Sequence, residues 1–449
     1  MVSADEHSLL ALFEQVMPAE RLQELEGKEK RKGGQDQIYT LPVVMEMMLL
    51  QRLTPEGTQQ ETVQQLLMGR LDHLVSDCKR IREKKVSSAT GSYSQACQRV
   101  PLNVLEKVCD ETLAELAKRI EREPELRRPL LLLDGTTFSV KHEKELLEEF
   151  PPARNQYGKA HWGILQMVAL HDVHTGIALR PAWGAMYGAN AVSEQRLAER
   201  VLEQSPVESV ILGDSNFGIF VFVFLVVRNQ RQAIVRLTKR RAQSLGAGKL
   251  LPTGEARITW RASRQDRRNH PELPADAEIQ GRLIAVSCYG LSEPLYLFTT
   301  LEEDWKTIVA LYAKRWNLEL DLRTLKQTLR MNQLRGRSKA SVEKELLIAT
   351  VAYGLVRTFM AAAARRAGLS PRELSFTAAY GLLNAAARKL CSPDRAVRLE
   401  TLDRVLGYIA KSKLPKRRKT RSYPRAVWGF RRTFPRRGPQ KPDLEEQTK

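Results

Sequence analysis

The segment between Asp304 and Leu329 combines a stripe of leucines with a strip of polar side chains. The leucines recur every three or four residues, or multiples of that spacing, at positions 311, 318, 322, 325 and 329. At about 100° per residue they fall within one arc of a helix, about 60° wide. A polar set with the spacing Y-x2-R-x3-E-x6-K shares a neighbouring arc and consists of Tyr312, Arg315, Glu319 and Lys326. We therefore predict one amphipathic helix that starts near Asp304 and runs to about Leu329.

Helical periodicity dominates residues 1–127, and we predict that they form a helical N-terminal domain. Apolar positions at helical spacing predict helices over 41–53, 58–71 and 104–120. A basic cluster lies between two of these helices and consists of Lys79, Arg80, Arg82, Lys84 and Lys85. This cluster is either a solvated connector or a DNA contact.

The pattern changes after Pro129 to short apolar runs separated by turns. The run 130–133 ends at Asp134, and Gly135 follows, which predicts a strand, a tight bend and a second strand. A later run, 207–212, predicts a strand that ends at Asp214. Strands followed by alternating helices and strands predict an α/β fold, with a mixed sheet flanked by helices.

Three further regions complete the predicted organisation. The turn-rich segment at about 239–302 predicts a small β insertion within a catalytic α/β domain that spans 128–335. Helical periodicity over 336–410 predicts a C-terminal helical region, which is a candidate for dimerisation. Residues 411–449 form a basic tail, with 13 Lys and Arg and no Asp or Glu between Lys411 and Lys441. Basic residues interleaved with aromatic ones suit DNA contacts, although a disordered solubilising tail is the alternative.

Composition narrows the class of partner. The chain has 449 residues, 43% of them hydrophobic, and a net charge of +20. A surplus of this size favours a polyanionic partner, usually nucleic acid. The longest apolar run, 217–227, has 11 residues, whereas a membrane-spanning helix needs about 20. The first residues lack a secretion signal and the five cysteines are scattered, so we expect no membrane and a cytoplasmic protein.

Two aspartates suggest what the polar strip does. Asp134 and Asp214 each follow an apolar strand, and the carboxyl edge of an open α/β sheet is where ligands collect. A single aspartate there is more often a turn or cap residue. Together with Glu319 they form a set of three carboxylates that would repel one another. Two divalent ions would remove this repulsion, and hard oxygen ligands favour Mg²⁺ or Mn²⁺. Two such ions suit an in-line displacement at phosphorus.

These residues carry a resemblance to a known family. The chain resembles the DDE transposases of the insertion-sequence-four family, within the RNase H-like, retroviral-integrase superfamily. The resemblance rests on Leu-Leu-Asp134-Gly-Thr-Thr, on Ile-Leu-Gly-Asp214-Ser-Asn-Phe-Gly and on the Tyr312-Arg315-Glu319-Lys326 signature. The stretches 91–101 and 421–425 add weaker similarities. The order of acid, acid, β insertion and acid-bearing helix also matches that family.

The resemblance implies an RNase H-like fold and a set of roles. Asp134, Asp214 and Glu319 would bind two Mg²⁺ ions, for which Mn²⁺ can substitute. Tyr312, Arg315 and Lys326 would contact the transposon-end DNA; Arg236 would do so too, or is a solvated charge at a strand end. The N-terminal domain would bind the DNA end. The reaction needs no nucleotide cofactor, and a homodimer would hold the paired ends, in a bacterial cytoplasm at the nucleoid.

Three functions remain open on these residues. The first is cut-and-paste transposition, in which the ends of double-stranded DNA at terminal inverted repeats are hydrolysed and the 3′-OH attacks target DNA. The second is a metal-dependent nuclease that cuts without joining, and the third is a non-catalytic DNA-binding protein derived from a transposase.

Other candidate residues receive a structural interpretation. Asp321 lies about 200° around the predicted helix from Glu319 and cannot join it in one cluster. Asp304 is a predicted N-cap. His161, His171 and His174 with Asp172 lack zinc-type spacing and are interpreted as strand and turn residues. Trp260 could stack on a flipped base, but we expect a core tryptophan. Ser215 replaces the arginine that the family often carries after the second aspartate.

Overall fold

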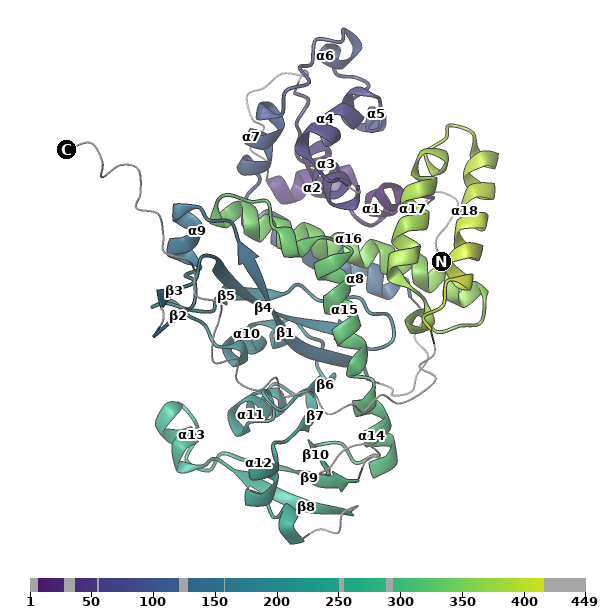
Figure 1. Cartoon of the computed structure of the whole chain (residues 1–449). Coiled ribbons are helices and arrows are strands. Elements are labelled where there is room, and N and C mark those ends of the chain that lie inside the picture. Colours follow the sequence, from purple (N-terminus) through teal and green to yellow (C-terminus); the bar gives the residue numbers. More distant parts are fainter. Residues whose placement is uncertain are drawn as a thin grey trace, which may run out of the picture.

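The computed structural model describes residues 7–27, 37–54, 56–120, 128–156, 158–249, 254–287 and 294–415 (Figure 1). For residues 155, 249, 316–320 and 333 it describes the backbone alone. The tail from residue 416, with its 421–425 motif, lies outside the described residues.

One mixed sheet organises the described chain. Its strands follow the order β5-β4-β1-β6-β7-β10-β9-β8. Neighbouring strands are parallel between β1 and β6 and between β6 and β7, and the other pairs are antiparallel. The bounds are β1 Leu130–Val140, β4 Gly163–Asp172, β5 Ala182–Ala185, β6 Val210–Gly213, β7 Gln232–Arg236, β8 Gly254–Arg261, β9 Glu278–Val286 and β10 Leu295–Thr299. The predicted α/β class is confirmed, and the sheet is consistent with the RNase H-like fold. A separate pair, β2 (Arg154–Asn155) and β3 (Gly158–Lys159), forms a small hairpin.

The predicted β insertion continues this sheet. Strands β8, β9 and β10 lie between β7 and the helix that starts at Trp305, as the sequence pattern predicts. However, β10 pairs with β7 through Leu297 and Arg236, so the three strands extend the edge of the main sheet. The short helices α12 (Lys239–Ser244) and α13 (Arg264–Asn269) occupy turns in this segment.

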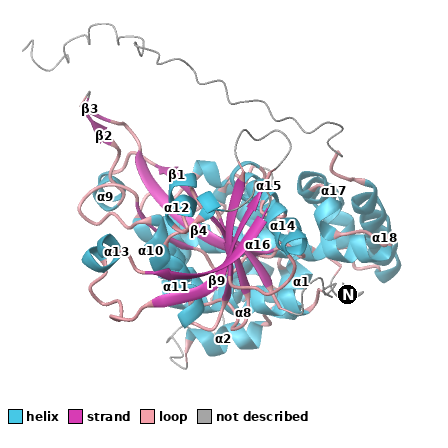
Figure 2. Ribbon diagram, turned by 90° about the horizontal axis from the view of Figure 1, so that it is seen from below, coloured by secondary structure: helices cyan, strands magenta, loops and turns pink. Residues whose placement is uncertain are grey.

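The two faces of the sheet carry two hydrophobic cores. Alternate leucines of β1 belong to different cores, because successive side chains of a strand point to opposite faces: Leu130 and Leu132 face one and Leu131 and Leu133 the other. The second core also contains residues of α10 (Glu194–Leu202) and α11 (Phe220–Arg228). Figure 2 shows the strands in the middle of the molecule with helices on either side.

The N-terminal region is helical throughout its described part, as predicted. Its helices are α1 Leu9–Val16, α2 Ala19–Glu26, α3 Leu41–Leu53, α4 Gln59–Leu67, α5 Asp72–Val75, α6 Lys79–Arg82, α7 Gly91–Arg99 and α8 Leu102–Lys118. The basic cluster forms α6 and the turn after it, where Lys79 and Lys85 both pair with Glu83. These helices lie above the sheet in Figure 1, with α16 between them and the strands.

Helix α16 (Lys339–Arg366) is the centre of the first core. It packs against α8, α3 and α1 of the N-terminal region and against α15 (Trp316–Gln327), α17 (Phe376–Leu390) and α18 (Arg395–Lys411). By length and composition it could cross a membrane, but 94% of its most apolar window is buried inside the protein. Its apolar character is therefore explained by its central position in the core.

Two local predictions are wrong. The predicted helix 304–329 is two helices, α14 (Trp305–Ala313) and α15 (Trp316–Gln327). At the junction the amides of Lys314 and Arg315 donate to carbonyls three residues back, which tightens the turn and ends the α-helical pattern. The predicted bend at Gly135 is also absent, because β1 continues through it as one strand of 11 residues.

Candidate active site

Asp134 and Asp214 lie on neighbouring parallel strands at the same level. The register of β1 and β6 pairs Leu130 with Val210 and Leu132 with Leu212. Each aspartate stands two residues beyond the last of these pairs, Asp134 within β1 and Asp214 directly after β6. Sequence reasoning placed Asp134 at a strand end, whereas it lies in the middle of β1, where that strand loses β6 as a neighbour but keeps β4.

Backbone amides hold both aspartates in place. Oδ1 of Asp134 accepts from the amide of Gly135 at 2.8 Å, and Oδ1 of Asp214 accepts from the amide of Asn216 at 2.8 Å. The second contact closes the turn after β6. These bonds restrict the orientation of both side chains.

A third carboxylate, Glu194, joins the two aspartates. It is the first residue of α10, whose N-cap is Ser193. Its Oε2 accepts from Nδ2 of Asn216 at 3.2 Å, the residue whose amide also holds Asp214. Burial raises the pKa of Glu194, and the charges of Asp134 and Asp214 raise it further. The structure thus brings a residue to the site that the sequence pattern did not single out.

Gly135 makes room for this carboxylate. A Cβ atom at Gly135 would lie 1.8 Å from Oε1 of Glu194, so only glycine leaves the space free. The glycine next to Asp134 was interpreted as a turn residue, but its backbone is extended within β1. Its role here is close approach of a neighbouring side chain, which is the other common reason for a glycine in a strand.

Two of the signature residues, Tyr312 and Arg315, lie beside the two aspartates. Nη1 of Arg315 lies 4.0 Å from Oδ2 of Asp134, and both side chains are largely buried. Tyr312 is 7% exposed. Burial raises its pKa, an effect that the nearby charges of Arg315 and Arg236 oppose and that Asp214 reinforces. Tyr312, Arg315 and Arg236 therefore lie together beside the aspartates.

Lys326 and Glu319 are carried by α15, which packs against β1. The ammonium group of Lys326 lies 5.2 Å from the ring centre of Phe138, four residues beyond Asp134 on β1. Burial lowers the pKa of Lys326. Glu319 lies on the first two turns of α15, and its side chain is outside the described atoms.

Asp321 holds α15 in place through contacts on the other side of the helix from Glu319. Its fully buried carboxylate binds Arg357 of α16 and Arg372, whose Nη1 lies 2.6 Å from Oδ2. Burial acts to raise the pKa of Asp321, but Arg372 and Arg357 outweigh it and hold the pKa below its usual range. Arg372 also donates to the carbonyls of Asp172 and Val173 at the end of β4. Asp321 thus lies in a network away from Asp134 and Asp214.

The donor set at the aspartates fits divalent metal ions. Three carboxylates lie at one site, and burial together with their mutual charge raises the pKa of Glu194. Oxygen-only ligands suit Mg²⁺ and Mn²⁺. Among the described residues, the group with three ligand atoms within 4.8 Å of one another is Glu14, Glu46 and His73, which are tied by His73 ion pairs. Asp134, Asp214 and Glu194 do not bring one ligand atom each this close to one another.

The remaining candidate residues have structural roles. Trp260 is 5% exposed and packs edge-on against Phe220 and Phe298, so it is a core tryptophan. His171 is fully buried and burial lowers its pKa to about 4. Asp172 accepts from the amides of His174 and Thr175 in the turn after β4. The N-cap at Asp304 is confirmed, since its side chain accepts from the amides of Lys306 and Thr307.

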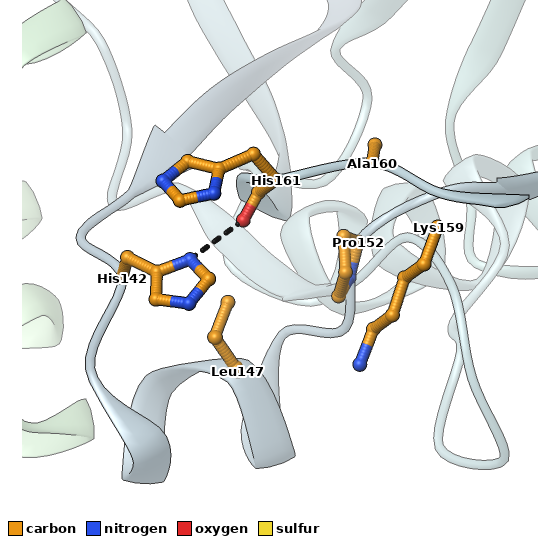
Figure 3. A pocket seen from close by; sticks show the side chains of 6 residues that line it. All are labelled: His142, Leu147, Pro152, Lys159, Ala160 and His161. Carbon is orange, nitrogen blue, oxygen red and sulfur yellow. Dashed lines mark hydrogen bonds between the residues drawn. The ribbon is translucent and has the colours of Figure 1, made fainter. Parts of the chain in front are cut away.

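A shallow hollow lies beyond the end of β1 (Figure 3). His142 stacks on His161 with ring centres 4.1 Å apart, and its Nδ1 contacts the His161 carbonyl at 2.9 Å. Lys159 of β3 lines the other side. The lining contains no carboxylate, so this hollow lacks the ligands that the aspartate site has.

Comparison with known proteins assigns the family. Residues 125–355, 231 of the 449, match the model of the transposase DDE domain. The chain is also 28% identical over 309 residues to the transposase InsG for insertion sequence element IS4 of Escherichia coli (strain K12). That similarity covers 66% of this chain and 67% of the relative. The chain belongs to the DDE transposases, in the insertion-sequence-four family. It is a transposase, a class of enzyme whose substrate is DNA and which generally uses divalent metal ions.

Proposed function

We propose that this transposase moves its insertion sequence by cut-and-paste transposition, with Asp134, Asp214 and Glu319 as the ligands of two Mg²⁺ ions. The observation that carries the proposal is the β1–β6 register, which sets the two aspartates side by side. Glu319 follows from its position on α15, the helix that packs on β1. When bound, the two ions would activate the attacking oxygen and stabilise the leaving oxygen of an in-line displacement.

The residues of the chain position the DNA for this reaction. Arg315 and Lys326 would bind phosphates next to the cleaved bond, because Arg315 lies beside Asp134 and Lys326 lies over Phe138 of the same strand. Tyr312 would support Arg315 from its buried position, and Arg236 would contact the same strand of DNA. The same site would serve both steps: water attacks first, and the released 3′-OH then attacks a phosphodiester of target DNA.

A cavity between the N-terminal helices and α16 is a candidate path for DNA, because most of its charged lining residues are basic. A cavity of about 930 Å³ lies between the N-terminal helices and the start of α16. Two carboxylates, Glu56 and Glu345, line it, together with six basic side chains: Arg52, Lys141, Arg330, Arg335, Arg337 and Lys344. We propose that residues 1–127 bind the transposon end, that residues 128–335 cut it and that the 336–410 region helps to pair two subunits on two ends. The protein would act in the cytoplasm, on nucleoid DNA.

The test separates catalysis from binding. Asp134→Ala, Asp214→Ala and Glu319→Ala should each reduce Mg²⁺-dependent cleavage of a terminal-repeat DNA to background. Binding of the same DNA, measured by fluorescence anisotropy, should stay within a few-fold of wild type. Glu203→Ala, an exposed change at the end of α10, is the matched control and should cleave normally.

Joined products decide between the proposed reaction and simple cutting. Terminal-repeat DNA and supercoiled target, incubated with Mg²⁺, should give repeat ends joined to new positions in the target. Cut ends without joined products would indicate a nuclease, and an absence of nicking under all metal conditions would indicate a DNA-binding protein without activity. Strand transfer retained by any of the three alanine variants would overturn the assignment of that residue.

A further inference from the structure

We propose that Lys141 and Arg330 bind phosphates of the transposon-end DNA on its path from the cleaved bond to the N-terminal helices. The proposal rests on the function proposed above, and it names the side chains of the large cavity that are available to DNA. Both residues follow elements of the candidate active site, since Lys141 comes directly after β1 and Arg330 comes three residues after the end of α15.

Four of the six basic side chains that line the cavity have partners within the protein. Two of them pair with carboxylates, and the other two donate to backbone carbonyls. These contacts are Arg52 with Glu345, Arg337 with Glu143, Arg335 with the carbonyls of Glu56 and Gly57, and Lys344 with the carbonyls of Cys97 and Gln98. The four side chains therefore hold the walls of the cavity together.

Lys141 and Arg330 are the other two basic residues of the cavity. In the part of the chain that the structure describes, neither side chain makes an ion pair or a hydrogen bond. Arg330 is exposed and Lys141 is partly buried. A cation without a partner on a cavity wall can bind an anion, and DNA offers phosphates in a regular row.

The positions of the two residues define a path that leads away from the aspartates. Because β1 is extended, Lys141 lies about 20 Å from Asp134. The short turn that follows Arg330, Met331–Gln333, packs against β1, so Arg330 stays close to the same strand. Figure 1 shows α15 extending from the sheet towards α16 and the N-terminal helices. Since one DNA strand carries a phosphate every 3.4 Å or so, a duplex that follows β1 would reach Lys141 about six base pairs from the cleaved bond.

The backbone of Arg330 adds an independent observation. Its conformation is left-handed, with φ 54° and ψ 31°. Many helices end in this conformation, and glycine usually occupies the position because a Cβ atom is strained there. Arg330 thus keeps a charged side chain where glycine would fit the backbone better. Residues held in such conformations cluster at functional sites, and a phosphate contact gives the guanidinium group a role outside the fold.

The salt dependence of DNA binding tests the proposal. Fluorescence anisotropy in EDTA measures how the full-length protein binds a terminal-repeat duplex at several KCl concentrations. Each lost phosphate contact should reduce the slope of log affinity against log salt concentration by about 0.9. We expect this reduction for Lys141→Gln and for Arg330→Gly, whereas Arg330→Lys, which keeps the charge, should keep the slope.

A nearby lysine provides the matched control. Lys144 is exposed on α9 (Lys144–Glu149) and does not line the cavity, so Lys144→Gln should bind with the wild-type slope. Unchanged slopes for Lys141→Gln and Arg330→Gly would overturn the inference. An equal loss in Lys144→Gln would overturn it as well, because it would show a general effect of charge.

Thermal melting separates a DNA contact from a structural role. Arg330→Gly removes the strained Cβ atom, so this variant should melt at the wild-type temperature or above it while it loses affinity. A lower melting temperature together with lower affinity would overturn the role of Arg330, because damage to the fold would explain both.

Neutral phosphates locate the contact on the DNA. Single methylphosphonate groups in the terminal-repeat duplex should weaken wild-type binding when they lie about six base pairs from the cleaved bond. The same groups should have no further effect on Lys141→Gln. Equal effects on both proteins at every position would overturn the contact with the transposon end, and a reduced slope on target DNA alone would assign the residues to target DNA instead.

These outcomes are separate from those that test the proposed function. If Lys141→Gln and Arg330→Gly bind DNA like wild type while Asp134→Ala and Asp214→Ala lose cleavage, the inference fails and the proposed function stands. If the two alanine variants still cleave, the proposed function fails, whatever the slopes show.

Discussion

Asp321 shows how one buried residue can position an active-site helix without entering the site. It lies on α15, and its carboxylate is shared by Arg357 of α16 and Arg372, which in turn binds the end of β4. Arg357 also lies over the rings of Tyr353 and Phe376. The network therefore ties the helix that carries Glu319 to the central helix and to the sheet.

We predict that Asp321→Ala is strongly destabilising. The substitution leaves two buried guanidinium groups without their carboxylate, and loss of one partner of a buried pair costs about 3–5 kcal/mol. Urea denaturation followed by circular dichroism measures the change. Asp403→Ala is the control, because Asp403 and Arg366 form an exposed pair, and its removal should change stability by less than about 1 kcal/mol. Equal effects of the two substitutions would contradict this account of the network.

The residues of the candidate site differ in how well their roles can be predicted from the sequence. Asp134 and Asp214 were recognisable because each follows an apolar strand, and Asp321 because helical geometry separates it from Glu319. Glu194 was not recognisable, since an acid at a helix N-terminus is ordinary. The packing of α10 against β4 and β5 brings it beside Gly135, the residue after Asp134, and that proximity joins residues 59 positions apart in the chain. Ser193 with Glu194, placed before a strand that ends in Asp214, is the signal that could have indicated it.

At the scale of elements, the sequence predicted where helices and strands lie better than where they end. Strong apolar runs predicted β1 and β6, and leucine spacing predicted the helical segment that carries the signature. The break between α14 and α15 has no proline or glycine to mark it, and Lys314 and Arg315 keep helical dihedral angles. A helical wheel cannot detect such a junction. The sequence also could not predict that β1 continues through Gly135. Glycine usually marks a turn, and here it lies within a strand.

The helices α1, α3 and α5 meet at one ion cluster that should make stability depend on pH. Nε2 of His73 lies 2.7 Å from Glu14 and 3.2 Å from Glu46, and Glu46 is 2% exposed. Burial raises the pKa of Glu46 to about 7, although His73 opposes the rise. Hydrogen bonds to Glu14 and Glu46 raise the pKa of His73 to about 10.

We predict that Glu46→Gln becomes more stable relative to wild type as the pH rises from 4.5 to 7. A raised pKa means that the folded state holds a proton at Glu46 that the unfolded state has released, so wild-type stability falls over this window. The glutamine side chain of the variant does not titrate. The free energy of unfolding of the variant, relative to that of the wild type, should therefore grow by up to about 3 kcal/mol over this window. Urea midpoints at pH 4.5, 5.5 and 7 measure it. Parallel pH curves for the two proteins would contradict the prediction.

At the scale of the whole molecule, one hydrophobic core joins regions that the sequence divides. Residues of α1, α3, α8, α16 and β1 belong to the same buried cluster. Arg335 strengthens the contact between the N-terminal region and the rest of the chain by donating to the carbonyls of Gly57 and Glu56. Arg52 donates across the same contact to the Leu329 carbonyl at 3.1 Å. The periodicity of apolar residues predicts a helical region and an α/β region, but it cannot show that α16 packs in a core common to both, because that depends on long-range packing.

The charge of the whole chain predicts the salt dependence of DNA binding. With a net charge of +20, binding should release counterions, so affinity should fall steeply as salt increases. Removal of residues 416–449, which contain 12 Lys and Arg, should reduce the slope of log affinity against log salt concentration. Fluorescence anisotropy between 50 and about 300 mM KCl measures that slope. An unchanged slope after truncation would exclude the tail as a phosphate contact.

The central claim is that Asp134 and Asp214 hold divalent metal ions at the level where β1 and β6 meet. Anomalous X-ray diffraction from crystals of the DNA complex grown with Mn²⁺ tests this claim most directly. The account predicts two anomalous peaks about 3.5–4 Å apart, in contact with Asp134, Asp214 and Glu319. Well-diffracting crystals with intact DNA and no peak beside Asp134 and Asp214 would contradict it.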